Sequence, residues 1–509
     1  MGATVERRAP AQEAVAEASG AGPWLTLPRL WLVVVLGAIG VMELAQVPNA
    51  VDLAYHLKVG QLMVAEHAVP RTDVLAWTTA GRPWLDQNWG AQLVLYGIWR
   101  LGGLPLLTVV GAALTVASWG LVAAACRRRT ADLRLVAGAV LAGYAVSAAA
   151  FSVRPELFSL LLFAAELYLL EVARTRPRVA LAIPLLTPLW ANLHGAFVVG
   201  IGLLVIEAVA AAWRRDRSGA VRYLLVTVAG IAGLLVNPWG VRVLGYAASL
   251  PTNQVVTRIV SEWGATNPRQ LTGVLAVGAL GLLVVALVRA PAPGRVPEQL
   301  LRMAVLGGLA LWAVRGVAWF GLALPVALCA LARERPPRPA AEDRGAPAVS
   351  VLVLVALAVA LVASAPPLGR VLLGPRPEMT FAPVASADWL AANPQPGRML
   401  NFQPWGSYLE LRLGPEVQAA FDSRVELPPE ELWDRYLAVF TGRWDTGRLL
   451  DDWGVGHVVL SRRSAPALAE LLERSGRWRV AFASGDQRVY VRVQGQQLGP
   501  GPGPPGAGA

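Results

Sequence analysis

Long apolar runs recur along the first 365 residues of the chain, and short polar segments separate them. A helix that crosses the hydrocarbon layer of a membrane needs about 17–25 mostly apolar residues. By this measure the runs predict about eleven spans, of which the fifth, ninth and tenth are short. The expected spans lie near residues 30–47, 104–125, 133–150, 156–173, 179–193, 195–213, 219–236, 271–288, 299–314, 316–332 and 347–365. The chain is therefore expected to be an α-helical polytopic membrane protein.

After residue 365 the pattern changes to short strands that alternate with amphipathic helical stretches. The expected strands are GRMLNF, VQAAFDS, HVVLS, WRVAFAS and RVYVRV, and PEELWDRYLAVF is one of the helical stretches. Alternation of this kind is typical of a small α/β domain. We thus expect a disordered N-terminus over 1–28, a membrane domain over 29–365, an α/β domain over 366–493 and a disordered Gly/Pro-rich tail over 494–509.

The distribution of charge predicts how the chain lies in the membrane. The sequence is 55% hydrophobic and 16% charged, with a mean hydropathy of +0.48, which excludes an ordinary soluble enzyme. A net charge of +11 is also found in nucleic-acid-binding proteins, but Lys58 is the only lysine, and arginines collect in short loops such as 127–129 and 214–217. Loops rich in arginine stay in the cytoplasm. We therefore expect a multi-pass protein of the cell membrane with a cytoplasmic N-terminus, an extracytoplasmic α/β domain and no nucleic-acid partner.

The first outer loop, residues 47–101, carries the most distinctive polar pattern. Its segment DLAYHLKVGQLMVAEH has apolar residues at helical spacing and predicts a helix that lies in the membrane interface, as does WGAQLVLYGIWRL. Asp52 comes where the first span ends, and His56 follows at the i+4 position on the same helix face. Asp86 comes later in the same loop. These three residues are the candidate catalytic groups.

The other outward turns also carry polar side chains. They contribute Arg154, Asn192, His194, Glu262 and Arg315, which are the candidate substrate-binding residues together with Trp84 and Trp89 of the first loop. Polar residues at membrane depth are costly and usually mark a site. The two cysteines, Cys126 and Cys329, lie in or at the end of apolar runs and allow neither a disulfide framework nor a Cys-x-x-Cys metal site.

Simpler structural roles compete with these functional ones. Asp52 is a favoured residue type for a helix N-cap, and Asp86 is a favoured residue type in turns. His194 would interact favourably with the C-terminal dipole of the fifth span. An arginine such as Arg154 can extend to lipid headgroups. The gathering of all these residues on one face is a stronger signal than any one of them.

The chain resembles polytopic glycosyltransferases of the C superfamily, which use lipid-linked sugar donors. The resemblance rests on the long first loop that opens with Asp52, on the many spans and on the soluble C-terminal domain. DLAYHLKVGQLM, VPRTDVLAWTTAGRPWLDQNW, RPELF, LWANLHGAF, NPWG, SEW and FDSR are similar to elements of a bacterial branch of that superfamily. The resemblance implies that Asp52 is the base, that His56 accompanies it, and that Arg154 or Arg315 contacts phosphate. Some relatives have an adjacent Asp-Glu pair after the first span, whereas Leu53 follows Asp52 here, so dependence on a divalent cation stays open.

The sequence therefore favours a glycosyltransferase that moves a sugar from a polyprenyl-phosphate donor to an extracytoplasmic glycan, lipid or protein. Trp84 and Trp89 would stack on the sugar, and membrane lipid would surround the site. No cofactor is certain. Two alternatives stay open: a non-catalytic protein of envelope or polysaccharide assembly, and a lipid or solute transporter.

Overall fold

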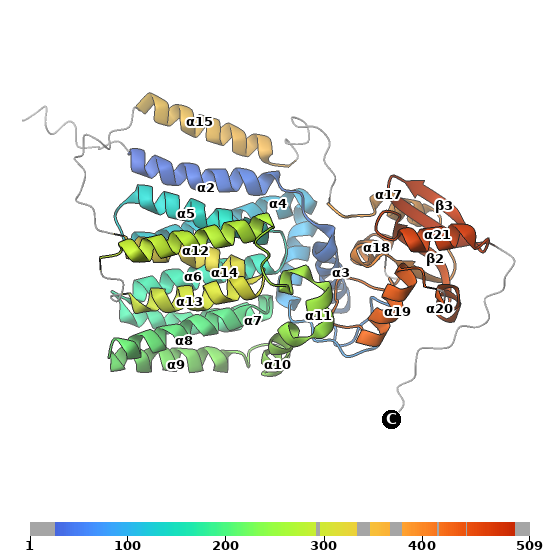
Figure 1. Ribbon diagram of the computed structural model, residues 1–509, viewed down its shortest axis with the longest axis horizontal. Coiled ribbons are helices and arrows are strands. Elements are labelled where there is room, and N and C mark those ends of the chain that lie inside the picture. The colour runs from blue at the N-terminus through green and yellow to red at the C-terminus, as the bar shows by residue number, and fades with distance from the viewer. Residues whose placement is uncertain are drawn as a thin grey trace, which may run out of the picture.

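The protein consists of a helical bundle with a small sheet domain beyond one of its ends (Figure 1). The computed structural model describes residues 26–291, 296–332, 347–366, 379–414, 417–443 and 445–493. The bundle helices run side by side and are α2 (Leu27–Ala45), α4 (Trp89–Arg127), α5 (Leu133–Ser147), α6 (Glu156–Ala173), α7 (Leu186–Leu193), α8 (Phe197–Trp213), α9 (Arg217–Gly233), α12 (Leu271–Arg289), α13 (Pro297–Trp312), α14 (Gly316–Leu331) and α15 (Pro347–Ser364). We call the end beside the sheet domain the domain end, and the other the opposite end.

A helix lies at each predicted span, but the helices differ in how well they suit a membrane. Four segments of the described chain are long and apolar enough to cross one: Leu27–Ala45, Trp89–Arg127, Leu133–Ala150 and Leu271–Arg289. The predicted span 179–193 is a 3₁₀ segment, Pro177–Leu185, followed by the short helix α7. Pro184 within that segment has no backbone N–H and so cannot donate the hydrogen bond of a regular α-helix. The protein is a helical membrane protein, whereas the count of eleven spans and their orientation stay predictions.

Both helices predicted in the first loop are present in the structure. The stretch from Trp89 is a helix that ends at Gly102 and Gly103, the latter at φ 63°, so α4 consists of two helices joined at a kink, and the predicted separation from the following span is confirmed. Helix α3 (Ala50–Glu66) is the other predicted helix, and its place in the membrane interface stays a prediction. It packs between α4 and helix α18 (Gly406–Leu413) of the sheet domain. Even Lys58 is only 3% exposed there.

The centre of the bundle is α14, which packs against α5, α13, α4 and α12. Most of its residues are buried, which agrees with a helix that is apolar on every side. Gly143 of α5 faces Gly321 of α14 so closely that a Cβ on Gly143 would lie 2.5 Å from the Gly321 carbonyl oxygen. Small residues thus allow these two helices to approach closely, as is common in membrane bundles.

The sheet domain has four strands in the order β1-β2-β4-β3. β1 (Arg398–Asn401) and β2 (Val455–Ser461) are parallel, while β4 (Gln487–Arg492) is antiparallel to both β2 and β3 (Trp478–Ser484). Its helices are α17 (Val384–Ala392), α18, α19 (Glu430–Phe440), α20 (Thr446–Asp452) and α21 (Pro466–Arg474).

The predicted strand VQAAFDS is not part of this sheet. Its Ala419 forms an isolated parallel bridge with Ala76 of the first loop instead. The Asn401 side chain fixes the segment by accepting a hydrogen bond from the Ala420 amide at 2.7 Å and donating one to the Phe421 carbonyl at 2.7 Å. A buried side-chain amide therefore replaces the expected strand pairing.

The sheet domain is joined to the domain end of the bundle by direct contacts. The Trp77 indole donates a hydrogen bond to the Met399 carbonyl, and the core of the domain includes Val255 of helix α11 (Gln254–Ile259). Arg424 reaches from the domain to Asp73 of the first loop, with both side chains buried. Helix α10 (Arg242–Ser249) lies at the same end of the bundle (Figure 1). The first loop is thus held between the two parts of the protein.

Candidate active site

At the domain end, one arginine gathers carboxylates from three separate segments. Arg154 lies in the turn before α6. Its Nη1 lies 3.5 Å from Oδ2 of Asp52 and 2.8 Å from Oε1 of Glu262. Its Nη2 lies 2.6 Å from Oε2 of Glu156. Asp52 comes from the first turn of α3 and Glu262 from the short 3₁₀ turn Ser261–Trp263, called η4.

Arg315 completes this group from the turn before α14. Its Nη2 lies 3.1 Å from Oε2 of Glu262. Its guanidinium lies over the Trp263 ring, 5.1 Å from the ring centroid, which is within the reach of a cation–π contact. Although burial disfavours its charged form, Arg154 and Arg315 together hold the pKa of Glu262 below its usual value. We call Asp52, Arg154, Glu156, Glu262 and Arg315 the arginine cluster.

The members of the arginine cluster differ in their access to solvent. The side chain of Asp52 is 44% exposed and that of Glu262 33%, whereas that of Glu156 is 3% exposed. Asp52 is not the N-cap of α3, because Asn49 holds that position and its side chain accepts a hydrogen bond from the Val51 amide. The helix-capping role that the sequence offered as an alternative for Asp52 therefore belongs to Asn49.

A chain of buried polar side chains contains the other two candidate catalytic residues. Asp86 accepts a hydrogen bond from the Gln92 amide at 2.9 Å, and the same nitrogen lies 3.4 Å from Nδ1 of His56. Burial raises the pKa of Asp86 to about 7, and burial together with Arg154 lowers the pKa of His56 to about 3. His56 is therefore a neutral imidazole at neutral pH, with the Gln92 amide beside its Nδ1.

His194 ends α7 and lies close to the same region. Its Nδ1 is 2.8 Å from the Ser159 hydroxyl, which also accepts a hydrogen bond from the Trp190 indole. Burial, and after it the charges of Arg315 and Arg154, lower the pKa of His194 well below its usual range.

The remaining predicted binding residues make structural contacts. The Asn192 amide donates to the carbonyls of Pro188 and Val236, and its oxygen accepts from the Trp89 indole at 2.9 Å. These bonds tie α4 to α7 and to the end of α9.

The ring of Trp84 is also occupied, because the Arg424 guanidinium lies 4.6 Å from its centroid and the residue is 4% exposed. The expectation that Trp84 stacks on a sugar is therefore not supported, since the sheet domain covers the ring. Sequence reasoning could not anticipate this contact, which joins residues far apart in the chain.

Sequence reasoning also missed Glu156, Gln92 and Arg424. Glu156 comes two residues after Arg154, and a carboxylate so near a predicted ligand arginine was an available signal. Gln92 had no such signal, because only the packing of α3 against α4 brings it to His56.

The described residues contain no group of three or more His, Cys, Asp or Glu side chains that is placed to hold a metal ion. In the arginine cluster, the positive charge between the carboxylates is a guanidinium.

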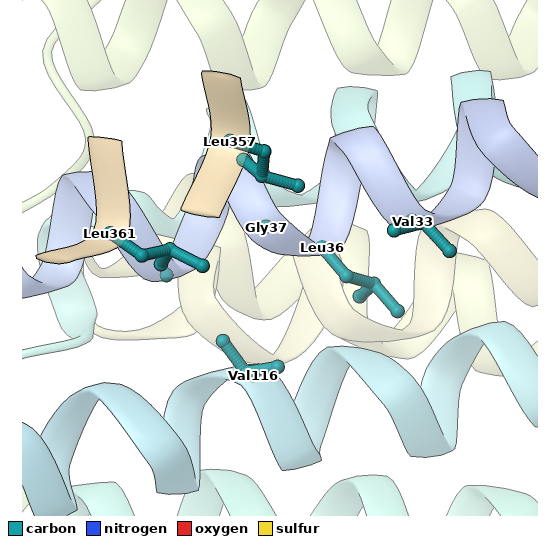
Figure 2. A pocket seen from close by; sticks show the side chains of 7 residues that line it. Val33, Leu36, Gly37, Val116, Leu357 and Leu361 are labelled. Carbon is teal, nitrogen blue, oxygen red and sulfur yellow. The ribbon is translucent and has the colours of Figure 1, made fainter. Parts of the chain in front are cut away.

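An apolar groove of about 350 Å³ lies elsewhere, between α2, α4 and α15 (Figure 2). Its lining is entirely aliphatic or glycine: Val33, Leu36, Gly37, Gly40, Val116, Leu357 and Leu361. The Leu357 side chain reaches over Gly37, where an added Cβ would lie 2.4 Å from it. No member of the arginine cluster lines this groove, so it is not the place of the polar chemistry.

The fold is similar to that of solved membrane glycosyltransferases. No family model matches the sequence, and no curated protein matches it. Among solved structures, the archaeal oligosaccharyltransferase AglB from Archaeoglobus fulgidus has a TM-score of 0.54 at 12% identity, covering 91% of this chain and 74% of its own. The arabinofuranosyltransferase AftD from Mycobacteria has a TM-score of 0.54 at 18% identity, covering 92% of this chain and 40% of its own.

The chain shares its fold with these two membrane glycosyltransferases. At these identities the likeness concerns the fold alone, but it confirms the resemblance that the sequence motifs indicated. The arrangement of the helices, and not close sequence similarity, carries this likeness.

Proposed function

We propose that the protein is a membrane glycosyltransferase that moves a sugar from a polyprenyl-phosphate donor to a hydroxyl of an extracytoplasmic acceptor. One observation carries the proposal: Arg154 contacts the partly exposed carboxylate of Asp52 and, through Glu262, is linked to Arg315. A candidate base and two cations that suit a phosphate are therefore adjacent. The fold likeness to AglB, whose solved complex contains a dolichol-phosphate, supports a lipid-linked donor.

The proposed reaction needs a base and a stabilised leaving group. The acceptor oxygen bonds to the anomeric carbon of the sugar while the bond from that carbon to the phosphate oxygen breaks. The electron pair stays with the departing phosphate, and the acceptor proton passes to the carboxylate of Asp52. Arg154 and Arg315 would stabilise the charge that develops on the phosphate, as guanidinium groups do with bidentate geometry.

The proposed topology places this chemistry at the outer membrane surface. Arginine-rich loops at 127–129, 174–178 and 214–217 lie on the connections opposite to the domain-end turns, and such loops stay in the cytoplasm. The domain end and the sheet domain would then be extracytoplasmic. A lipid-linked donor fits a site at this position, because its prenyl chain stays in the membrane while its phosphate reaches the surface.

Asp52→Asn tests the proposal. The substitution keeps the size of the side chain but removes the carboxylate that would accept the proton. We expect transfer from a panel of polyprenyl-phosphate hexoses and pentoses to fall by roughly 10²–10⁴-fold. The measurement uses the full chain in lipid nanodiscs, with thermal unfolding recorded for each variant.

Glu66→Gln is the matched control, because Glu66 is an exposed carboxylate at the far end of the same helix. It should leave transfer unchanged. Wild-type turnover in Asp52→Asn would refute the role of Asp52 as base. Absence of transfer by the wild-type protein with every donor and acceptor would favour the non-catalytic assembly function instead.

A further inference from the structure

Glu262 holds two arginines with one carboxylate. Its Oε1 contacts Nη1 of Arg154 at 2.8 Å, and its Oε2 contacts Nη2 and Nε of Arg315 at 3.1 and 3.2 Å. Each oxygen thus serves a different guanidinium, and the two guanidiniums come from separate turns of the bundle. Two non-bridging oxygens of a phosphate offer the same arrangement to a pair of arginines.

Each arginine also has a second partner that is independent of Glu262. Glu156 binds Arg154 at 2.6 Å from a buried position, and the Trp263 ring lies against Arg315. These partners would keep both guanidiniums in place if the Glu262 carboxylate moved away. Arg154 and Arg315 therefore do not depend on Glu262 for their position, and the Glu262 carboxylate can be replaced by another anion.

The main chain of Glu262 is fixed, while its side chain is one-third exposed. The Arg315 amide donates to the Glu262 carbonyl at 3.0 Å, and the Val314 amide donates to the Gly264 carbonyl at 3.0 Å. A rotation of the side chain alone can therefore withdraw the carboxylate into solvent without unfolding η4. Such side-chain rotations are fast compared with enzyme turnover.

We propose that Glu262 is an exchangeable occupant of the donor phosphate site, which the phosphate of the lipid-linked donor displaces. The inference rests on the proposed function and assigns a role within the same site. A phosphodiester and a carboxylate each carry one negative charge, so the exchange conserves the charge around Arg154 and Arg315. After transfer, the returning carboxylate competes with the phosphate of the spent lipid carrier and assists its release.

The test measures the binding of farnesyl phosphate to the full chain in detergent by calorimetry. Glu262→Gln removes the competing charge, and we expect its Kd to be roughly tenfold lower than that of the wild type. Glu262→Asp keeps the charge but shortens the reach to two arginines, so its Kd should lie between the two. Each variant is also checked by thermal unfolding.

Two controls separate exchange from a general effect of charge. Asp52→Asn removes the same charge from the same cluster but not the bridge between the arginines, so it should tighten binding less than Glu262→Gln. Glu66→Gln should bind like the wild type. Inorganic phosphate, titrated in the same way, should bind more weakly than farnesyl phosphate because it lacks the apolar chain.

Each alternative result has a distinct meaning. If Glu262→Gln binds more weakly or equally, Glu262 is a fixed anchor and the exchange is refuted, while the proposed function stands. If inorganic phosphate binds as tightly as farnesyl phosphate, the site is a simple anion site and the lipid-linked ligand is refuted. If neither phosphate binds to any variant, the phosphate site of the proposed function is refuted together with the exchange.

Discussion

The two ends of the bundle both hold arginines paired with glutamates, but in opposite states of burial. At the opposite end, Arg302 of α13 binds Glu171 of α6 at 3.0 Å and Glu207 of α8 at 2.6 Å, and the three side chains are at most 3% exposed. Arg129 adds contacts with Glu171 and Glu298, whose side chains are fully buried. We call these five residues the inner network. At the domain end, by contrast, the carboxylates of Asp52 and Glu262 reach solvent.

The difference shows how the same residue types serve two purposes. A buried pair cannot exchange its partner, because each freed charge would remain out of water at a high cost. An exposed carboxylate can leave its arginine, since water replaces the lost contact and the net strength of such a pair is small. The inner network is therefore suited to tie α6, α8 and α13 together, and the arginine cluster is suited to bind and release a ligand.

The largest expected effect is on stability and comes from the inner network. Arg302→Met leaves Glu171 and Glu207 buried without this partner, and breaking a buried pair costs about 3–5 kcal/mol. Unfolding in mixed detergent micelles measures the change. Arg315→Met is the matched control at the domain end, where we expect less than about 1 kcal/mol because Glu262 can turn to solvent. Equal losses in the two variants would contradict the comparison.

A smaller effect should come from Asp86, which is buried at the domain end near the arginine cluster. Its pKa of about 7, against an ordinary value of 3.8, means that the folded protein holds a proton that the unfolded chain releases between these values. The stabilisation from this proton is complete below about pH 4 and is lost as the pH rises to about 7. Asp86→Asn keeps an acceptor for Gln92 but cannot lose a proton.

The measurement is the stability difference between Asp86→Asn and the wild type at two pH values. As the pH rises from about 5.5 to 7, the free energy of unfolding of the variant should increase relative to that of the wild type by roughly 2 kcal/mol. His56 is present in both proteins, so its own titration cancels to first order. A difference that does not change with pH would show that Asp86 is ionised in the folded protein throughout.

The smallest effect concerns salt. The contribution of Arg315 to stability, of the order of 0.2–1 kcal/mol, should disappear when the salt concentration rises from about 0.05 to about 0.5 M, because exposed pairs are screened. The loss in Arg302→Met should stay the same over that range. Unfolding of both variants and the wild type at the two concentrations provides the test. Equal salt sensitivity would mean that both ends are equally open to ions.

Much of the candidate site was predictable from the position of polar residues along the chain. Asp52, Arg154, Glu262 and Arg315 all come at the ends of apolar runs on one predicted face, and the structure brings these four together. Their pairing was not predictable, because they come from four distant segments. The role of Asn49 as the cap of α3, which frees Asp52, also depended on the local backbone.

The covering of the first loop by the sheet domain was not predictable either. The loop sequence indicated a helix whose apolar face needs a partner, with the membrane as the nearest one, and tryptophans that stack on a sugar. In the structure α18 supplies that partner, and Arg424 covers Trp84 while pairing with Asp73. A single sequence shows that an apolar surface must be covered but not which segment covers it.

The sequence by itself determined the helices and their apolar character, and it placed the polar turns together at one end, because helix length and the alternation of turns follow from local pattern. Only the tertiary structure decided which charges stay in contact with solvent. Glu171 and Glu262 are the same residue type beside arginines, yet one is enclosed by neighbouring helices and the other lies at an open turn. Burial depends on what packs around a side chain, and that packing comes from segments far apart in the chain.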